Sequence, residues 1–253
     1  MNRVVLLSLL FLAFFIGACN GNKPVQPDYS ISGEMPHDIK VLQGQAVVAF
    51  RVVRVYNHIL INIPSPNLVT LASGPQAAGI TVNFQGANAG RPNFNASIAV
   101  NVANTVAAGS YPVSITGTAA GIPQKNVSTH TVRVFGPADG GAYIEVIPSS
   151  ELTIRPGEGK SIIARVTRIP PFVGNVTVTF PGAGSALPTG VTVAGQQQFV
   201  VALNAANPSK DVQFLIQAGD NASGISVAKA EVMTGAGAAA KTDESPLIIV
   251  VAQ

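Results

Sequence analysis

The stretch RVVRV at residues 51–55 returns as RVTRI at residues 165–169, and this repeat decides the fold. Both stretches are rich in the β-branched residues that favour extended strands. A glycine turn precedes each of them, QG at residues 43–44 and PG at residues 156–157. The sequence therefore predicts a long strand at the same position in two copies of one unit.

The match between the two copies continues beyond these strands. ILINIP at residues 59–64 corresponds to VTVTFP at residues 176–181, and AGITV at residues 78–82 corresponds to TGVTV at residues 189–193. The copies are about 110 residues apart. This spacing indicates a tandem domain duplication, because the repeats of a solenoid are only roughly 20–50 residues long.

Later in each copy the correspondence is looser. We align IAVN at residues 98–101 with VVAL at residues 200–203, and YPVSI at residues 111–115 with VQFLI at residues 212–216. The offset between the copies is then about 101 residues here, compared with about 117 at its largest. The prediction is that these late strands correspond in this order.

The composition favours a folded chain of strands and turns. Its 25 Gly and 18 Pro residues separate short runs, such as residues 97–102 and 176–180, in which apolar and polar side chains alternate. Such alternation places one face of a strand on a core and the other in water. We therefore predict an all-β protein with two antiparallel β-sandwiches at residues 29–136 and 142–253, joined by a linker at residues 137–141.

Residues 1–18 have the layout of a secretory signal. A short basic start that ends at Arg3 is followed by an apolar run of about 15 residues, interrupted only by Ser8. This run is shorter than the roughly 20 residues that a transmembrane helix needs. The sequence therefore predicts an exported chain whose signal is removed.

The signal ends in Ile16-Gly17-Ala18-Cys19, and Cys19 is the only cysteine of the chain. An aliphatic residue, two small residues and Cys resemble the lipobox of bacterial lipoproteins. The resemblance implies that Cys19 receives a diacylglycerol, that the chain is cut just before it, and that residues 19–28 link the lipid to the first sandwich. The alternative is a cysteine near the end of an ordinary signal, in which the branched Ile16 would fit poorly at position −3.

The same resemblance implies a location for the protein. Two or more acyl chains anchor a protein stably, whereas one chain does so only marginally. Position 20 is Asn rather than the Asp that, in the resembled family, tends to retain lipoproteins at the inner membrane. We expect the outer membrane if the cell has two membranes, and otherwise the outer face of the cell membrane, with the membrane as a partner through the lipid on Cys19.

The rest of the chain resembles the bacterial immunoglobulin-like repeats of exported and surface proteins. The resemblance rests on the turns at Gly44 and Gly157, on LPTGVT at residues 187–192 and on GSYPVSI at residues 109–115. It implies two tandem immunoglobulin-like sandwiches after a cleaved lipoprotein signal peptide. It implies little about function, because one fold carries many functions.

The histidines show no metal-binding pattern. His37, His58 and His130 have no second His or Cys at metal-ligand spacing. Asp38 follows His37 and is able to orient its imidazole, but a solvated loop is the plainer interpretation. We therefore expect no catalytic residue, no metal and no cofactor.

Two further motifs are incomplete. GISVA at residues 224–228 lacks the final Gly of a nucleophile elbow and the strand-to-helix turn that exposes its serine. Asp139, followed by Gly140 and Gly141 in the linker, offers too few oxygen ligands for calcium. Neither motif predicts a site.

Three side chains are the candidates for contact with a partner. Tyr56 and His58 follow the first long strand, and Phe172 follows the second, so we expect them in equivalent loops of the two copies. The other aromatic residues are spread through the chain without a cluster, which favours core packing.

Charge argues against nucleic acid as a partner. Residues 28–135 contain six Lys or Arg and three Asp or Glu, whereas residues 142–253 contain seven and eight. Neither copy has a block of five like charges or a basic stripe interleaved with aromatics.

The expected function is that of an exported, lipid-anchored, non-catalytic module that binds or structures the cell envelope, with envelope proteins or glycans as partners. The alternative is a hydrolase, or an accessory subunit of an enzyme that processes envelope carbohydrate or peptide. A pocket that contains His37, Asp38 and a serine favours the alternative. Two sandwiches arranged end to end without such a pocket favour the binding or structural module.

Overall fold

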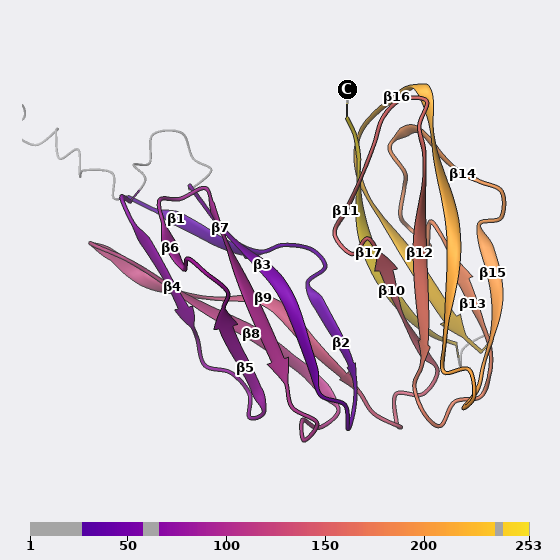
Figure 1. Cartoon of the computed structure of the whole chain (residues 1–253), viewed down its shortest axis with the longest axis horizontal. Coiled ribbons are helices and arrows are strands. Elements are labelled where there is room, and N and C mark those ends of the chain that lie inside the picture. Colours follow the sequence, from indigo (N-terminus) through magenta and orange to yellow (C-terminus); the bar gives the residue numbers. More distant parts are fainter. Residues whose placement is uncertain (1–26, 58–65, 236–239, 253) are drawn as a thin grey trace, which may run out of the picture.

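The computed structural model describes residues 27–57, 66–235 and 240–252 (Figure 1). Strands, turns and loops make up these residues, and no helix occurs among them. The described part of the chain accordingly has no helix able to cross a membrane. The predicted all-β class is confirmed, whereas Cys19 and the predicted signal at residues 1–18 lie outside the described residues.

The first unit of the described chain contains nine strands: β1 (Tyr29–Gly33), β2 (Asp38–Leu42), β3 (Val47–Asn57), β4 (Val69–Ser73), β5 (Ile80–Phe84), β6 (Ala89–Gly90), β7 (Phe94–Val102), β8 (Gly109–Ala119) and β9 (Ile122–Phe135). They form one sheet in the order β1-β3-β7-β5 and a second in the order β2-β9-β8-β4-β6. Neighbouring strands are antiparallel except β2 and β9, which are parallel.

Alternation along the strands builds the core between these two sheets. On β3, Val53 and Val55 are buried while Arg54 between them is exposed. Leu71 and Ile115 from the second sheet meet Ile98 and the β3 valines of the first sheet in one apolar cluster. The period of two in the sequence therefore decides which side chains face inward.

The second unit contains eight strands within the described residues: β10 (Ala142–Ile147), β11 (Glu151–Ile154), β12 (Gly159–Arg168), β13 (Gly174–Thr179), β14 (Thr189–Ala194), β15 (Gln198–Leu203), β16 (Ser209–Thr234) and β17 (Lys241–Val251). The long strand β16 pairs with β12 and β14 through its first half and with β13 and β17 through its second half. Because β16 passes from one layer to the other, all eight strands belong to one continuous sheet that folds over its own core.

The two units have the same strand pairing. β1 pairs with β3 as β10 pairs with β12, and β2 pairs in parallel with β9 as β11 does with β17. β16 combines the roles of β7 and β8 in a single strand. Every strand pair of the described residues lies within one unit.

The alignment of the late strands was wrong. Residues 212–216 pair with β12 as residues 98–101 pair with β3, so they correspond to β7 and not to residues 111–115 in β8. Residues 200–203 belong to β15, which pairs with β13 as the short β6 pairs with β4. The second unit has six residues where β6 has two, and this longer strand shifted the alignment by one strand.

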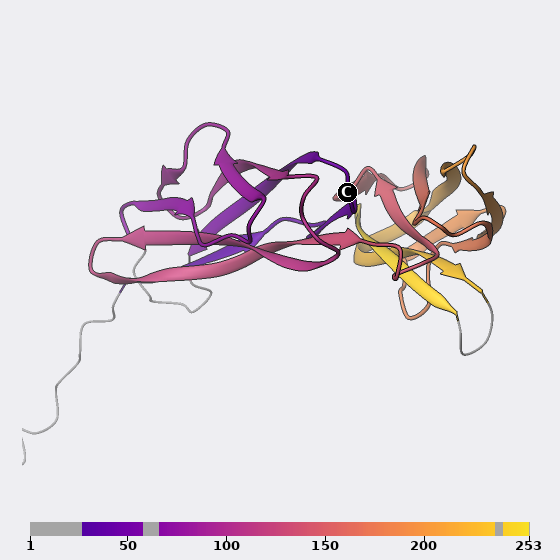
Figure 2. The same ribbon diagram turned by 90° about the horizontal axis from the view of Figure 1, so that it is seen from below.

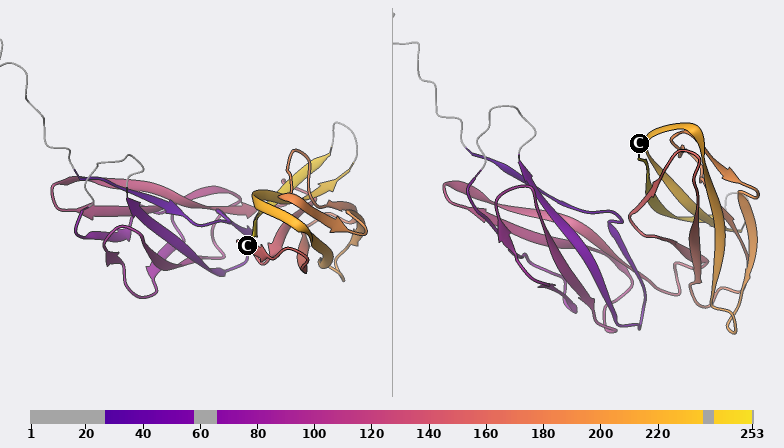
Figure 3. Two further views of the ribbon diagram at one scale, coloured as in Figure 1. Left: turned by 90° about the horizontal axis from the view of Figure 1, so that it is seen from above. Right: turned by 45° about the horizontal axis from the view of Figure 1, so that its top comes forward.

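The chain passes between the units through a turn at residues 137–139, with β9 ending at Phe135 and β10 starting at Ala142. Figure 2 shows that the two units follow each other along the long axis of the molecule. In Figure 3 the C-terminal end of the last strand, β17, lies on the side of the second unit that faces the first.

Candidate functional site

The predicted contact residues do not share a surface. Tyr56 is half-buried near the end of β3, opposite Ser30. Phe172 is half-buried against the second core and lies over Gly174, next to the contact between the units. His58 lies outside the described residues. β3 and β12, which these residues follow or end, are equivalent in topology, but Tyr56 belongs to the first unit and Phe172 to the second.

Two histidines that are far apart in the sequence come together at the start of β2. Because β2 and β9 are parallel, His37 lies beside His130, with 6.1 Å between the ring centroids. They line a shallow hollow of about 290 Å³ together with Ser32 and Ser128. Single-sequence reasoning missed this pair, since nothing in the sequence shows that the two strands are neighbours.

His130 is almost completely buried and has a structural environment. Its Nε2 donates to the carbonyl oxygen of Glu34 at 3.1 Å, and its Nδ1 lies 3.2 Å from the hydroxyl of Thr129. Burial lowers the pKa of His130 to about 4, against the opposing effect of the Glu34 hydrogen bond. His130 is therefore neutral near pH 7. Its hydrogen bond to Glu34 holds the chain just after the end of β1.

His37 is exposed, and Asp38 does not orient it. The Nδ1 of His37 lies 3.3 Å from the carbonyl oxygen of Thr129, while the carboxylate of Asp38 lies 3.5 Å from Arg133. The hydroxyl of Ser32 donates to the carbonyl oxygen of Gly33. The hollow thus contains His37 and two serines, whereas Asp38 points to the joint between the units.

The two incomplete motifs have structural roles. Ser226 lies inside β16 and donates to the carbonyl oxygen of Ala186 at 2.5 Å. Asp139 accepts a hydrogen bond from the backbone N–H of Gly136 at 2.6 Å, and the ammonium of Lys241 donates to the carbonyl oxygens of Ala138 and Asp139. Among the described residues, no group of three His, Cys, Asp or Glu is placed to hold a metal ion.

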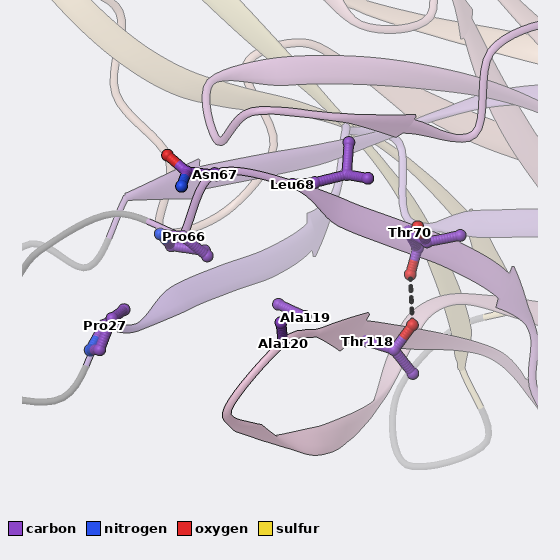
Figure 4. A pocket seen from close by; sticks show the side chains of 8 residues that line it. All are labelled: Pro27, Pro66, Asn67, Leu68, Thr70, Thr118, Ala119 and Ala120. Carbon is purple, nitrogen blue, oxygen red and sulfur yellow. Dashed lines mark hydrogen bonds between the residues drawn. The ribbon is translucent and has the colours of Figure 1, made fainter.

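A larger hollow of about 480 Å³ lies at the end of the first unit (Figure 4). Its wall includes Pro27, Leu68 and Ala119, and the hydroxyl of Thr118 donates to the carbonyl oxygen of Thr70. The residues that line it carry no charge. It therefore offers apolar contact and two threonine hydroxyls but no titratable group.

A group of buried polar contacts lies at the joint between the units, where Lys40 and Arg133 of the first unit meet Asp243 of the second. The Nζ of Lys40 lies 2.6 Å from the Oδ2 of Asp243, and both side chains are about 5% exposed or less. Arg133 adds a second contact, 2.8 Å from the other oxygen of Asp243. One carboxylate of the second unit therefore holds two cations of the first.

An apolar contact lies next to these charges. The rings of Phe135 and Tyr143 are stacked, with 5.1 Å between their centroids and 3° between their planes. Ile169 and Leu42 complete this small cluster. Burial raises the pKa of Glu145 on β10, and the charges of Lys40 and Arg51 oppose that rise. The joint thus combines packing of apolar side chains with paired charges.

Sequence reasoning missed the joint, although two signals were present. Asp243 and Ser245 occupy inward-facing positions of β17, where Leu247 and Ile249 follow at the same period. A buried Asp or Lys is rare unless it is paired. A polar residue in the apolar phase of a strand therefore indicates a buried partner.

Comparisons with known proteins do not assign the chain to a family. No family model matches it, and no curated protein matches it. Among solved structures it is similar to the secreted serine protease VesC from Vibrio cholerae, with 8% identity and a TM-score of 0.29. That similarity covers 77% of this chain and 48% of the protease, so the chain spans about half of its length. At this TM-score the likeness supports no conclusion about fold or activity.

Proposed function

We propose that the chain is an exported, lipid-anchored, non-catalytic module of the cell envelope, built from two immunoglobulin-like β-sandwiches. The lipid on Cys19 attaches it to a membrane, and the second unit presents a surface to envelope proteins or glycans. The shared strand pairing of the two units supports a duplicated sandwich. The layout of residues 1–19 supports export and lipidation.

One observation carries this proposal: the chain enters the first unit at the end farthest from the second unit. Tyr29, at the start of β1, lies beside Lys125 near the start of β9, with the ammonium 4.8 Å from the ring centroid. β9 then runs to Phe135 at the joint. Ten residues of strand span about 33 Å, so β9 separates the end at which the chain enters the first unit from the joint with the second unit by about that length.

The anchor is tested with Cys19→Ser. A hydroxyl does not replace the thiolate in lipidation, so this variant should lose labelling by fatty acid and should no longer sediment with membranes. The unchanged chain is the control. A variant that is still labelled and still sediments would overturn the proposed anchoring.

The orientation is tested on the lipidated chain in vesicles that contain a fluorescent lipid acceptor. A donor on Ala120→Cys, at the turn after β8, should transfer energy strongly, and a donor on Thr192→Cys in β14 should transfer little. Both positions are exposed. Equal transfer from the two positions would contradict an upright arrangement.

The hydrolase alternative is tested at the histidine hollow. His37→Ala should leave folding, lipidation and envelope integrity unchanged if the chain is a binding or structural module. Asp38→Ala also removes a carboxylate near Arg133, so His37→Ala is the cleaner variant. An envelope defect in a folded and lipidated His37→Ala protein would favour the enzyme.

A further inference from the structure

We infer that the joint fixes the two units at one angle, with Lys40 as the residue that holds them together, so that the tandem moves as a single rigid body. This inference goes beyond the proposed function and does not depend on lipidation. It concerns the contacts between residues 38–42 and 133–135 of the first unit and residues 142–145 and 241–244 of the second.

Every hydrogen of the Lys40 ammonium is directed at the second unit. It donates to the Oδ2 of Asp243 at 2.6 Å and to the backbone carbonyl oxygens of Ile144 at 2.9 Å and Glu244 at 2.6 Å. A lysine has three N–H donors. The side chain of Lys40 is 4% exposed, so a shift of the second unit would leave a buried charge without partners, which is costly.

The carboxylate of Asp243 accepts hydrogen bonds from both units. Its Oδ2 accepts the backbone N–H of Ile144 at 3.0 Å as well as Lys40, and its Oδ1 accepts Arg133. The bond to Ile144 fixes the carboxylate relative to its own unit. The two bonds from Lys40 and Arg133 then fix the first unit relative to that carboxylate.

Comparison of the two units shows that the fold itself does not need these charges. Lys40 on β2 pairs with Arg133 on β9, and the topologically equivalent pair in the second unit is Thr153 on β11 and Val250 on β17. Thr153 is exposed and Val250 is half-exposed. The same sheet forms with uncharged residues at these positions, so Lys40 and Arg133 serve the joint.

Two other contacts oppose rotation about the ionic one. The Phe135 and Tyr143 rings stack beside Ile169, and Lys241 reaches back to the carbonyl oxygens of Ala138 and Asp139 in the connecting turn. The Lys241 ammonium thereby links the two carbonyl oxygens of the connecting turn to β17. Ionic, aromatic and turn contacts together leave no free hinge at residues 137–141.

The test measures the distance between the units in the full chain carrying Cys19→Ser, in which introduced cysteines are the only thiols. Spin labels go on Ser97→Cys in β7 and Thr192→Cys in β14, both exposed. Double electron–electron resonance should give one narrow distance distribution. Because the Lys40 pair is buried, this distribution should stay narrow in 1 M NaCl, in which exposed charges are screened beyond roughly 3 Å.

Lys40→Met should then broaden the distribution at least twofold, because a thioether cannot donate to the three oxygens. Lys160→Met is the matched control. Lys160 is 40% exposed, lies 3.4 Å from Glu158 and donates to the carbonyl oxygen of Thr153, so all of these contacts lie within the second unit, and this variant should leave the distribution unchanged. Arg133→Gln provides a second variant if Lys40→Met does not fold. A broad distribution in the parent chain, or a narrow one in both joint variants, would overturn the inference.

Discussion

Removal of the Asp243 carboxylate by Asp243→Ala should destabilise the chain more than any surface charge deletion. The substitution leaves the ammonium of Lys40 buried with two neutral carbonyls, and it leaves the N–H of Ile144 without its acceptor. Breaking a buried ion pair by removing one partner costs about 3–5 kcal/mol. For a chain of this length that corresponds to a fall of roughly 6–20 °C in the melting temperature.

Asp211→Ala is the matched control. Asp211 receives both a 2.8 Å and a 2.9 Å bond from Arg165, so its pair is geometrically the better one, but both side chains are nearly half exposed. Exposed pairs contribute about 0–1 kcal/mol. The comparison therefore separates burial from hydrogen-bond geometry.

The assay is urea denaturation of both variants and the parent at one pH, followed by circular dichroism. A double variant, Lys40→Met with Asp243→Leu, should recover part of the lost stability, because apolar replacement of a whole buried pair is often neutral, although the N–H of Ile144 still lacks its acceptor. The reasoning is refuted if Asp243→Ala lies within about 1 kcal/mol of Asp211→Ala, since Lys40 would then reach water when its partner is removed.

Three further predictions follow from local geometry. Gly33→Ala should lower the free energy of unfolding by about 1–3 kcal/mol or more, because the added Cβ would lie 2.0 Å from the carbonyl oxygen of Thr129. In Gly44→Ala the added Cβ meets no atom, so a urea titration of this variant reports only the cost of placing alanine at a positive φ. The free energy of unfolding should fall by about 2–4 kcal/mol from pH 6.5 to pH 4, since the unfolded chain gains a proton on His130 near pH 6.5 and the folded chain only at about pH 4. His130→Leu should lack this part of the pH dependence. A pH profile of His130→Leu identical to that of the parent chain would contradict this prediction. Residues 142–253 alone should melt cooperatively by circular dichroism, because their core cluster is complete within that range, and a disordered fragment would show that the units depend on each other.

The period of the sequence was sufficient to predict strands such as β3, β12 and β13 and the glycine turns, but not their partners. The predicted strand at residues 59–64 lies outside the described residues. The turn glycines Gly44, Gly157 and Gly190 have positive φ values of 84°, 77° and 73°, a conformation that glycine adopts without steric cost. Alternation at residues 176–180 likewise predicted one buried face, and Val176, Val178 and Phe180 are buried there. These are local properties, and local residues decide them.

The parts that sequence reasoning missed depend on residues far apart in the chain. Lys40 and Asp243 are 203 residues apart, and Arg133 and Asp243 are 110 residues apart. The late-strand alignment failed for a related reason, because the short apolar runs VVAL in β15 and VQFLI in β16 are similar in composition. Only the pairing of each strand identifies its counterpart.

The charged character of the joint has a physical explanation beyond stability. β2 is an edge strand, and a lysine on an edge strand opposes pairing with other chains before the molecule is complete. Lys40 lies between the buried Ile39 and Val41 with its side chain on the opposite face, so it protects that edge while the second unit is unfolded or unformed. Once the second unit folds, Asp243 and two carbonyl oxygens accept the same ammonium. An apolar residue at position 40 would leave this edge unprotected before the second unit folds, so Lys40→Met should aggregate more than Lys160→Met during refolding from urea.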